Sequence, residues 1–549
     1  MRRNALATLL TTARAEMQRR RFLSHGALFL STASTIGPLL FQDEARASAL
    51  PSIGAQQPFD YAQLKGMARA RADAPYEAPT DKLPPRIEKL TWDEWQSIHF
   101  RAERALWADA DLPFRAQFFH LGFRMTRPVR LHVVENGMSR EIAYDPSMYD
   151  YGKAHIAPRE VPRDLGFAGF NLFSHADWSR DRVAFQGASY FRAVDASWQY
   201  GMSQRGLAVD CGMPYPEEFP DFVAFYLERP TAGSDTVTVH ALLDSPSVSG
   251  AYRFVIKVED TTVMDIDAAL YPRKQIERIG IAPGTSMFFY GKNDRRIADD
   301  WRPEIHDSDG LQMWSGNGEW LWRPLINPHV VRVNSFADEQ PRGFGLMQRE
   351  RAFTQYEDDG VFYEKRPSVW VQPKGNWGKG SVMLVEIPTR DEITDNVVAF
   401  WCPAEKPQAG EEYLVSYRLH WGPSNPFFDT GHAFATRTGI GGVVGRKHDY
   451  FSWRFVVDFA GGSLESLTEK SRVRAVVAAS RGRVELISAR PLLPQNGWRA
   501  MFDLVPTDDS TDPVNLRLYL ALDGQALTET WLYQYEPPPM AERATILSS

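Results

Sequence analysis

The densest group of residues able to do chemistry lies between positions 301 and 396 of the chain. Its first part places acidic and imidazole side chains beside tryptophans, namely Glu304, His306, Asp307, Asp309, Trp314, Trp320 and Trp322. This is not a usual core composition, so it indicates a polar site. Residues 307–310 (Asp-Ser-Asp-Gly) echo part of a calcium loop, but the later ligands of that loop are absent. We therefore expect acid/base chemistry here and no metal.

A second acidic group follows the apolar segment 382–387, which its composition predicts as a strand. Asp391, Glu392 and Asp395 are candidates because the end of a strand can present side chains to a cleft. A solvated turn is equally compatible with this pattern. If Asp391 and Asp307 converged, one carboxyl could donate a proton to a leaving oxygen while the other activated water. That division of labour is what glycoside hydrolysis requires.

Other kinds of chemistry lack their motifs. The chain has no G-x-S-x-G nucleophile elbow, no G-x-G-x-x-G opening a βαβ unit and no Walker A segment, which argues against an α/β-hydrolase and against nucleotide use. The formal charge is only −7 over 549 residues and no basic cluster occurs beyond the N-terminus, so nucleic acid and anionic membrane surfaces are not expected partners. We expect no cofactor.

Aromatic residues make up 12% of the chain, with 16 Trp, 20 Tyr and 32 Phe. Most of them are expected to fill β cores. Others suit a neutral ligand such as a carbohydrate, because sugar C–H faces stack on aromatic rings while the hydroxyls bind polar groups.

The first 47 residues have the three parts of an export signal. Arg19, Arg20 and Arg21 precede Phe22 and Leu23, an apolar run occupies 27–41, and Ala-Arg-Ala ends at position 47. The apolar run is shorter than the ~20 residues that span a bilayer. The paired arginines favour twin-arginine export, with the general secretory route and an uncleaved anchor as alternatives. Translation could start at Met1 or at Met17.

The mature part is predicted to be all-β. A helix is expected at 59–74, and period-two alternation then predicts strands such as 129–134, 236–243 and 252–258. The Pro- and Gly-rich segment 403–412 is expected to be a linker between a large sandwich domain, 48–402, and a smaller one, 413–549, of a length that suits an immunoglobulin-like sandwich. The two cysteines, Cys211 and Cys402, match no metal-ligand spacing, and whether they form a disulfide stays open.

Several long segments together resemble the periplasmic glucans biosynthesis family, OpgG and OpgD (also called MdoG and MdoD). They are 164–170 (DLGFAGF), 187–192 (GASYFR), 241–246 (ALLDSP), 304–310 (EIHDSDG), 316–320 (GNGEW) and 385–389 (VEIPT). The similarity covers essentially the whole mature chain, and the leader is similar to that of the OpgD branch. It implies a galactose-mutarotase-like β-sandwich followed by an immunoglobulin-like domain, and a periplasmic protein that acts on linear β-1,2-glucan.

The resemblance also implies roles for residues. Members of the family cleave β-1,2-glucan internally with inversion, and the acidic residue after the Ile-Pro-Thr motif falls on Asp391, which we expect to be the general acid. We expect Asp307 to be the base, with Asp309 and Glu304 as alternatives. Substrate contacts are expected from Tyr190, Arg192, Glu304, His306, Trp314, Trp320, Trp322, Arg349 and Tyr363. A glucan-binding scaffold and a transglycosylase remain alternatives to an endo-β-1,2-glucanase.

Overall fold

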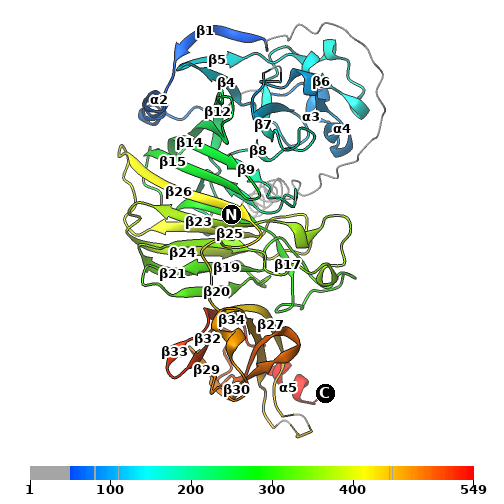
Figure 1. Ribbon diagram of the computed structural model, residues 1–549, viewed down its shortest axis with the longest axis vertical. Coiled ribbons are helices and arrows are strands. Elements are labelled where there is room, and N and C mark those ends of the chain that lie inside the picture. The colour runs from blue at the N-terminus through cyan, green and yellow to red at the C-terminus, as the bar shows by residue number, and fades with distance from the viewer. Residues whose placement is uncertain (1–49, 80–81, 109, 444, 448, 549) are drawn as a thin grey trace, which may run out of the picture.

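The computed structural model describes residues 50–548 apart from 80–81, 109, 444 and 448. The predicted leader, 1–47, therefore lies outside the described residues. Strands dominate the described chain, which confirms the prediction of a mostly β protein. The molecule is elongated, with a large β body at one end and a smaller body, formed mainly by the C-terminal strands, at the other (Figure 1).

The largest sheet has 16 strands and runs through both bodies. Its neighbouring strands are antiparallel, except that β4 pairs with β12 and β20 with β34 in parallel. In spatial order it contains β1 (Ser52–Pro58), β5 (Met138–Ile142), β4 (Arg130–Glu135), β12 (Asp221–Glu228), β13 (Thr236–Asp244), β14 (Val248–Val258), β15 (Thr262–Pro272), β26 (Tyr413–Gly422), β23 (Ser368–Lys374), β22 (Gly343–Met347), β19 (Gly310–Trp314), β20 (Trp320–Pro324), β34 (Thr530–Tyr535), β32 (Val514–Leu522) and β29 (Arg474–Ala479), with β33 (Gln525–Ala526) beside β32.

A second sheet of 10 strands faces the first one in the large body. Its order is β21 (Arg332–Glu339), β24 (Lys379–Glu386), β25 (Val397–Pro403), β16 (Ile279–Ser286), β10 (Ser203–Arg205), β9 (Tyr190–Ala193), β8 (Val183–Gln186), β7 (Phe167–Ser174) and β3 (Phe114–His120), with β11 (Leu207–Val209) beside β16. Aromatic rings join the two layers: the ring centroids of Phe170 and Phe225 lie 5.1 Å apart, and those of Phe185 and Phe254 lie 5.2 Å apart. The main hydrophobic core lies between these sheets.

Short elements complete the large body. The predicted helix is confirmed as α2 (Tyr61–Asp73), which begins where the Asp60 side chain accepts a hydrogen bond from the Gln63 backbone. It packs on the outer face of β13, β14 and β15. The remaining short elements are α3 (Pro85–Glu88), α4 (Trp92–Gln96), β2 (His99–Phe100), β6 (Tyr149–Asp150), β17 (Phe288–Tyr290) and β18 (Ile305–His306), and α5 (Met540–Ser548) ends the described chain.

The smaller body is also a two-layer structure. A sheet of β27 (His432–Ile440), β28 (Trp453–Ala460), β31 (Gly497–Val505) and β30 (Arg483–Leu492) packs against β29, β32 and β34 of the large sheet. Phe455 and Phe502 contact Trp531 across the layers, with centroids 6.1 and 6.3 Å apart. Because β34 pairs with β20, the two bodies share one sheet.

The strand β26 bears on the domain division that the sequence predicts. Residues 413–422 are assigned by that prediction to the C-terminal domain, yet β26 pairs along its length with β15 on one side and β23 on the other. The polar segment 404–412 therefore connects β25 of one layer to β26 of the other layer of the same sandwich. We propose that the C-terminal unit begins after Gly422.

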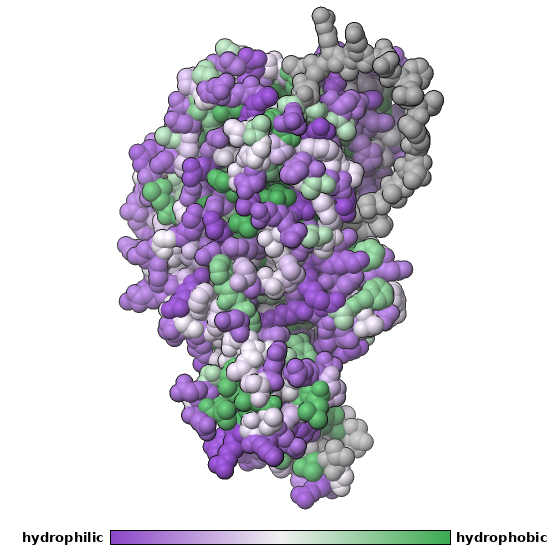
Figure 2. Space-filling model, in the orientation of Figure 1, coloured by the Kyte–Doolittle hydropathy of each residue, from purple (hydrophilic) through white to green (hydrophobic). Residues whose placement is uncertain are grey.

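Cys211 and Cys402 are both free thiols and pack in one small apolar cluster with Val385 and Phe400. No helix among the described residues is long and apolar enough to cross a membrane. Figure 2 shows a mostly hydrophilic face on which apolar residues form small separate groups.

Candidate active site

Asp307 lies in a buried polar cluster at one side of the large sandwich. It follows the two-residue strand β18, which pairs with β17, and its backbone N–H donates to the Met287 carbonyl at 2.8 Å. The side chain is buried and accepts a hydrogen bond from Arg366. The Arg366 guanidinium in turn lies over the Tyr363 ring, 4.2 Å from its centroid. The Arg366 guanidinium therefore holds the Asp307 side chain in place.

Asp395 is the second carboxyl of this cluster. Burial, reinforced by the charge of Asp307, raises its pKa from 3.8 to about 7, against the opposing charges of Arg192, Arg366 and Arg205. Its Oδ2 atom is enclosed and makes no hydrogen bond within the described part of the chain. A carboxyl of this kind is protonated for much of the time near neutral pH and can donate a proton.

Two asparagines position the segment that carries Asp395. The Asn396 side chain accepts from the Phe288 N–H at 2.8 Å and donates to the carbonyls of Phe288 and Ile387 at 3.0 and 2.9 Å. Asn327 makes a similar pair of bonds with the backbone of Thr389. Both ends of the turn 388–396 are therefore fixed, and Asp395 is held next to β17 and β18.

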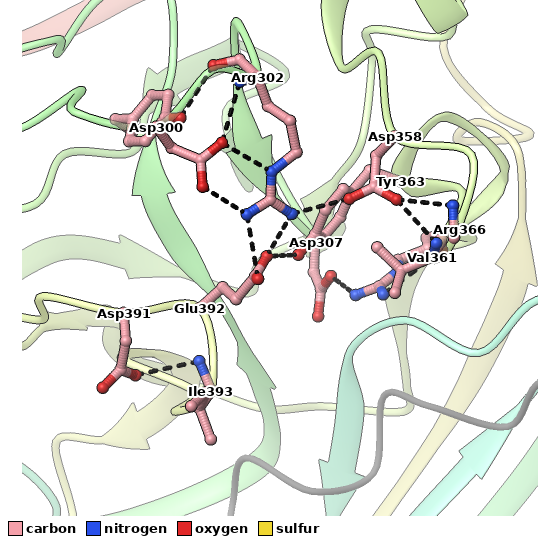
Figure 3. A network of polar contacts seen from close by, with 12 residues as sticks. Asp300, Arg302, Asp307, Asp358, Val361, Tyr363, Arg366, Asp391, Glu392 and Ile393 are labelled. Atoms are coloured by element: carbon pink, nitrogen blue, oxygen red, sulfur yellow. Dashed lines mark hydrogen bonds and ion pairs between the residues drawn. The ribbon is translucent and has the colours of Figure 1, made fainter.

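Arg302 ties its own segment to two others (Figure 3). Its guanidinium donates to Asp300, to Asp358 at 2.7 Å and to both oxygens of Glu392 at 2.8 and 3.1 Å. The Tyr363 hydroxyl also donates to Glu392. Burial raises the Tyr363 pKa, and the carboxylates of Asp307 and Glu392 add to this effect. Arg302 thus connects the turn 388–396 to the segment that carries Tyr363 and Arg366.

Asp391, the general acid expected from the sequence, lies outside this network. It is exposed, and its carboxylate accepts from the Ile393 backbone at 3.0 Å while the Thr389 hydroxyl donates to its carbonyl. Figure 3 shows its carboxylate directed away from the Arg302–Glu392 pair. These are the contacts of a solvated turn, the alternative that the sequence left open.

Tyr190 and Arg192 of β9 lie on the same side as Asp395. The charge of Arg192 acts on the Asp395 carboxyl, and its Nε donates to the Ser203 hydroxyl at 2.7 Å. Tyr190 is buried, and burial raises its pKa, to which Asp395 adds. The structure thus brings together Asp307, Tyr190, Arg192 and Tyr363 of the expected residues with Asp395, which the sequence analysis named as a candidate beside Asp391.

Glu304, His306 and Asp309 point into a different cluster. Lys292 donates to Glu304 and Glu350, and His306 contacts Glu304 at 3.2 Å and Gln348 at 2.9 Å. Although burial disfavours its charge, His306 and Lys292 lower the Glu304 pKa to about 2. The Asp309 Oδ2 accepts the backbone N–H groups of Arg349 and Glu350, and burial raises its pKa.

This second cluster borders the C-terminal body. A small cavity of about 30 Å³ is lined by Glu304, His306 and Asp309 together with residues 433–436 of β27. Successive residues of an extended segment point to opposite sides, so Asp307 faces Arg366 while His306 faces the other way. These three residues therefore line the junction of the two bodies, and we propose that they help to join them.

The predicted aromatic contacts also lie at this junction. Trp314 and Trp320 stack with centroids 4.6 Å apart, and Trp320 meets Phe428 edge-on. Trp322 is buried beneath the Arg349 guanidinium, 3.5 Å from its ring centroid, and Arg349 is paired with Glu529. All three tryptophans pack against the core of the C-terminal body.

Arg302, Asp358 and Arg366 are the cluster members that the sequence did not single out as site residues. Their charges are visible in the sequence, but no spacing links them to Asp307, since tertiary contacts alone bring them together.

Among the described residues, no group of three or more His, Cys, Asp or Glu side chains is arranged to hold a metal ion.

Comparison of the sequence with known proteins identifies one family. The family described as "Periplasmic glucan biosynthesis protein, MdoG" matches residues 59–535. The chain is 58% identical to Glucans biosynthesis protein D of Stenotrophomonas maltophilia (strain K279a), covering 95% of this chain and 98% of that one. It is 56% identical to the protein of the same name from Xanthomonas campestris pv. campestris (strain B100), covering 96% and 99%. The chain therefore belongs to the MdoG family of periplasmic glucan biosynthesis proteins.

Proposed function

We propose that this protein is an endo-acting glycoside hydrolase that cleaves linear β-1,2-glucan with inversion and so controls its length. Family membership supports glucan as the substrate class. The observation that carries the catalytic part is the unequal pair of carboxyls: Asp395 has a pKa of about 7 beside Asp307, which is paired with Arg366. Two neighbouring carboxyls in such different environments suit an acid and a base.

We assign the general acid to Asp395 rather than to Asp391. A general acid must hold a proton at the working pH and lie within reach of the leaving oxygen. Asp395 has the raised pKa and the neighbours for this role, whereas Asp391 is exposed and bonded only within its own turn. Both residues follow the Ile-Pro-Thr motif, so the general acid still lies in the segment where the family resemblance placed it.

We assign the general base to Asp307. Its side chain is held by Arg366 beside Asp395, where a carboxylate can accept a proton from water. A β-1,2 linkage crowds the scissile oxygen with neighbouring hydroxyls, so the proton can pass through a substrate hydroxyl or a water molecule. Arg192 and Tyr190 lie beside Asp395 and are the first candidates for substrate contacts.

The Arg302 network has a positioning role in this scheme. By bonding to Asp358 and Glu392, Arg302 fixes the turn that carries Asp395 against the segment that carries Tyr363 and Arg366. Displacements of about 1 Å in such a site cost up to ~100-fold in rate. The network therefore maintains the distance between acid and base.

The finer architecture and the location are part of the proposal. We propose that the large body is of the galactose-mutarotase type and that the C-terminal body is immunoglobulin-like. The family description supports a periplasmic location, and we propose that the leader directs twin-arginine export. Linear β-1,2-glucan is then the partner, with no nucleic acid, stable membrane insertion or cofactor required.

Product analysis tests this function against its alternatives. Purified protein is incubated with linear β-1,2-glucan, and new reducing ends, product length and product anomer are followed. Hydrolysis with inversion yields shorter chains and new reducing ends of the α anomer. A scaffold would retard glucan in an affinity gel but yield no new ends, and a transglycosylase would redistribute chain lengths with few new ends. Either of the latter results would contradict the proposal.

A further inference from the structure

A cavity of about 430 Å³ lies at one rim of the large sandwich and shares no residue with the candidate active site. Because β4 and β12 run in parallel, both begin at this rim, and their antiparallel neighbours β5 and β13 end there. The start of β7, from the facing sheet, forms the opposite wall, and residues 76, 77 and 79, which follow α2, form part of the remaining lining. We call this space the rim cavity.

The charged groups of the rim cavity are mostly paired. Arg71 donates to Asp244 at 2.8 Å, and Arg130 donates to Glu141 at 3.0 Å. Asp221 accepts from Arg127. These pairs fix the positions of carboxylate oxygens and guanidinium N–H groups while cancelling most of their charge. Such walls offer hydrogen bonds to a polar ligand without selecting an ion.

The apolar part of the lining is aromatic and aliphatic. The buried ring of Tyr144 has its hydroxyl bonded to His120 at 2.9 Å, so mainly the carbon face of the ring is available to the cavity. Leu131 and Ile142 are buried beside it, and Tyr76 is half-buried. A ring face beside fixed carboxylates and guanidinium groups suits the two kinds of surface that a sugar presents.

Two of the segments that carry the family resemblance lie outside the candidate active site and line the rim cavity instead. The segment 164–170 contributes Asp164, Gly166 and Phe167 to the lining, and the segment 241–246 contributes Asp244. Gly166 has a φ of +84°, and a Cβ at this position would meet the Pro128 side chain at 2.9 Å. Glycine therefore allows the turn to close against Pro128 and leaves the carboxylate of Asp164 at the cavity.

We propose that the rim cavity is a second glucan-binding site that holds uncharged glucosyl units away from the point of cleavage. The inference rests on the proposed function, because it takes the substrate to be a glucan. Its volume falls within the ~300–1,000 Å³ range of small-ligand sites. For a polymer, a second point of attachment raises the effective concentration of the chain at the first. The site would thus favour long chains over short ones.

Hydrogen exchange locates the bound glucan directly. Asp395→Asn protein, used so that the glucan stays intact, is compared with and without linear β-1,2-glucan, with dextran as the control polymer. We expect protection of peptides covering 74–79 and 163–167 as well as of peptides covering 302–309. Tyr76→Ala and Glu77→Gln, each added to this background, should abolish the first protection and keep the second. Tyr450→Ala, which replaces an exposed tyrosine of the C-terminal body, should keep both.

Each outcome is decisive. Protection of 302–309 alone overturns the second site and leaves the proposed function standing. Protection at the rim alone supports the second site and contradicts the active-site assignment. Protection of neither region contradicts both. Kinetics give a second measurement: in the otherwise wild-type enzyme, Tyr76→Ala should raise the KM for long glucan by about fivefold or more relative to Tyr450→Ala, and an equal KM in the two variants would overturn the inference.

Discussion

Replacing Asp395 by asparagine is expected to stabilise the folded protein at neutral pH. The folded state raises the pKa of this carboxyl to about 7, chiefly through burial. An acid whose folded pKa lies above its unfolded pKa opposes folding at every pH at which the unfolded chain is ionised. Asparagine has nearly the same shape but no charge to desolvate, so the substitution removes this cost.

The size of the stabilisation follows from how far the folded protein raises the Asp395 pKa. The difference between 3.8 and about 7 corresponds to a cost of at most ~4 kcal/mol at ~1.4 kcal/mol per pKa unit. Partial access of solvent to the side chain reduces it, and we expect a gain of about 1–3 kcal/mol above pH 7. The cost is absent below about pH 4, grows as the pH rises and is complete above the folded pKa. The stabilisation should follow the same course.

Thermal unfolding of wild type, Asp395→Asn and Asp391→Asn at pH 4.5 and pH 8 measures this. Asp391 is the matched control, because it lies in the same turn but is exposed. We expect Asp395→Asn to unfold a few degrees above wild type at pH 8 and close to wild type at pH 4.5. Asp391→Asn should stay within about 1 °C of wild type at both.

Two results would contradict a desolvation cost at Asp395. If Asp395→Asn were no more stable than wild type at pH 8, the carboxyl would carry no desolvation cost in the folded state. If the gain were equal at both pH values, it would come from something other than the charge. A gain at pH 8 together with lost activity would show that stability is given up for function at this position.

Three further predictions concern the site and its support. In a pH–rate profile, glucan cleavage should slow above about pH 7 as Asp395 ionises. Arg192→Met removes a positive charge that lowers the Asp395 pKa, so it should shift this decrease to a pH about one unit higher. A decrease at the same pH in both proteins would contradict the assignment. Arg302→Met should lower kcat by about 10- to 100-fold with a smaller change in KM, because Arg302 would no longer link Glu392 of the turn 388–396 to Asp358. A kcat equal to that of wild type would exclude a positioning role. Trp322→Ala should lower the free energy of unfolding by about 3–5 kcal/mol, measured by denaturant titration, yet keep kcat within about twofold of wild type. A large rise in KM without loss of stability would instead indicate that Trp322 contacts the substrate.

Local pattern was enough to predict many of the strands. Residues 236–243 and 252–258 alternate as sheet residues do, and they fall within β13 and β14. The helix at 59–74 was also visible, since Asp60 provides its N-cap. Which strands become neighbours depends on contacts between distant segments. The polar segment 404–412 resembles a linker in the sequence, although β26 that follows it returns to the large sheet.

The candidate site was predicted in part for the same reason. The concentration of acids near Asp307 is a local signal, and it indicated the segment from which the proposed site takes Asp307. Asp391 and Asp395 follow the same strand, and nothing local indicates which of them turns inward. That is decided by Asn327 and Asn396, whose bonds to Thr389 and Phe288 set the path of the turn. The side to which Glu304 and His306 point is likewise set by Lys292 and Gln348, which are distant in the sequence, and Asp309 is held by the backbone of Arg349 and Glu350.

In the proposed mechanism, Asp395 supplies the proton for cleavage of β-1,2-glucan. The most direct measurement is the rate at which new reducing ends form from linear β-1,2-glucan at pH 6, compared between wild type, Asp395→Asn and Asp391→Asn. Loss of the general acid should lower the rate of Asp395→Asn by about 100- to 10,000-fold, while Asp391→Asn should remain within about twofold of wild type. An Asp395→Asn protein that cleaves like wild type, or an Asp391→Asn protein that is inactive but folded, would contradict the account.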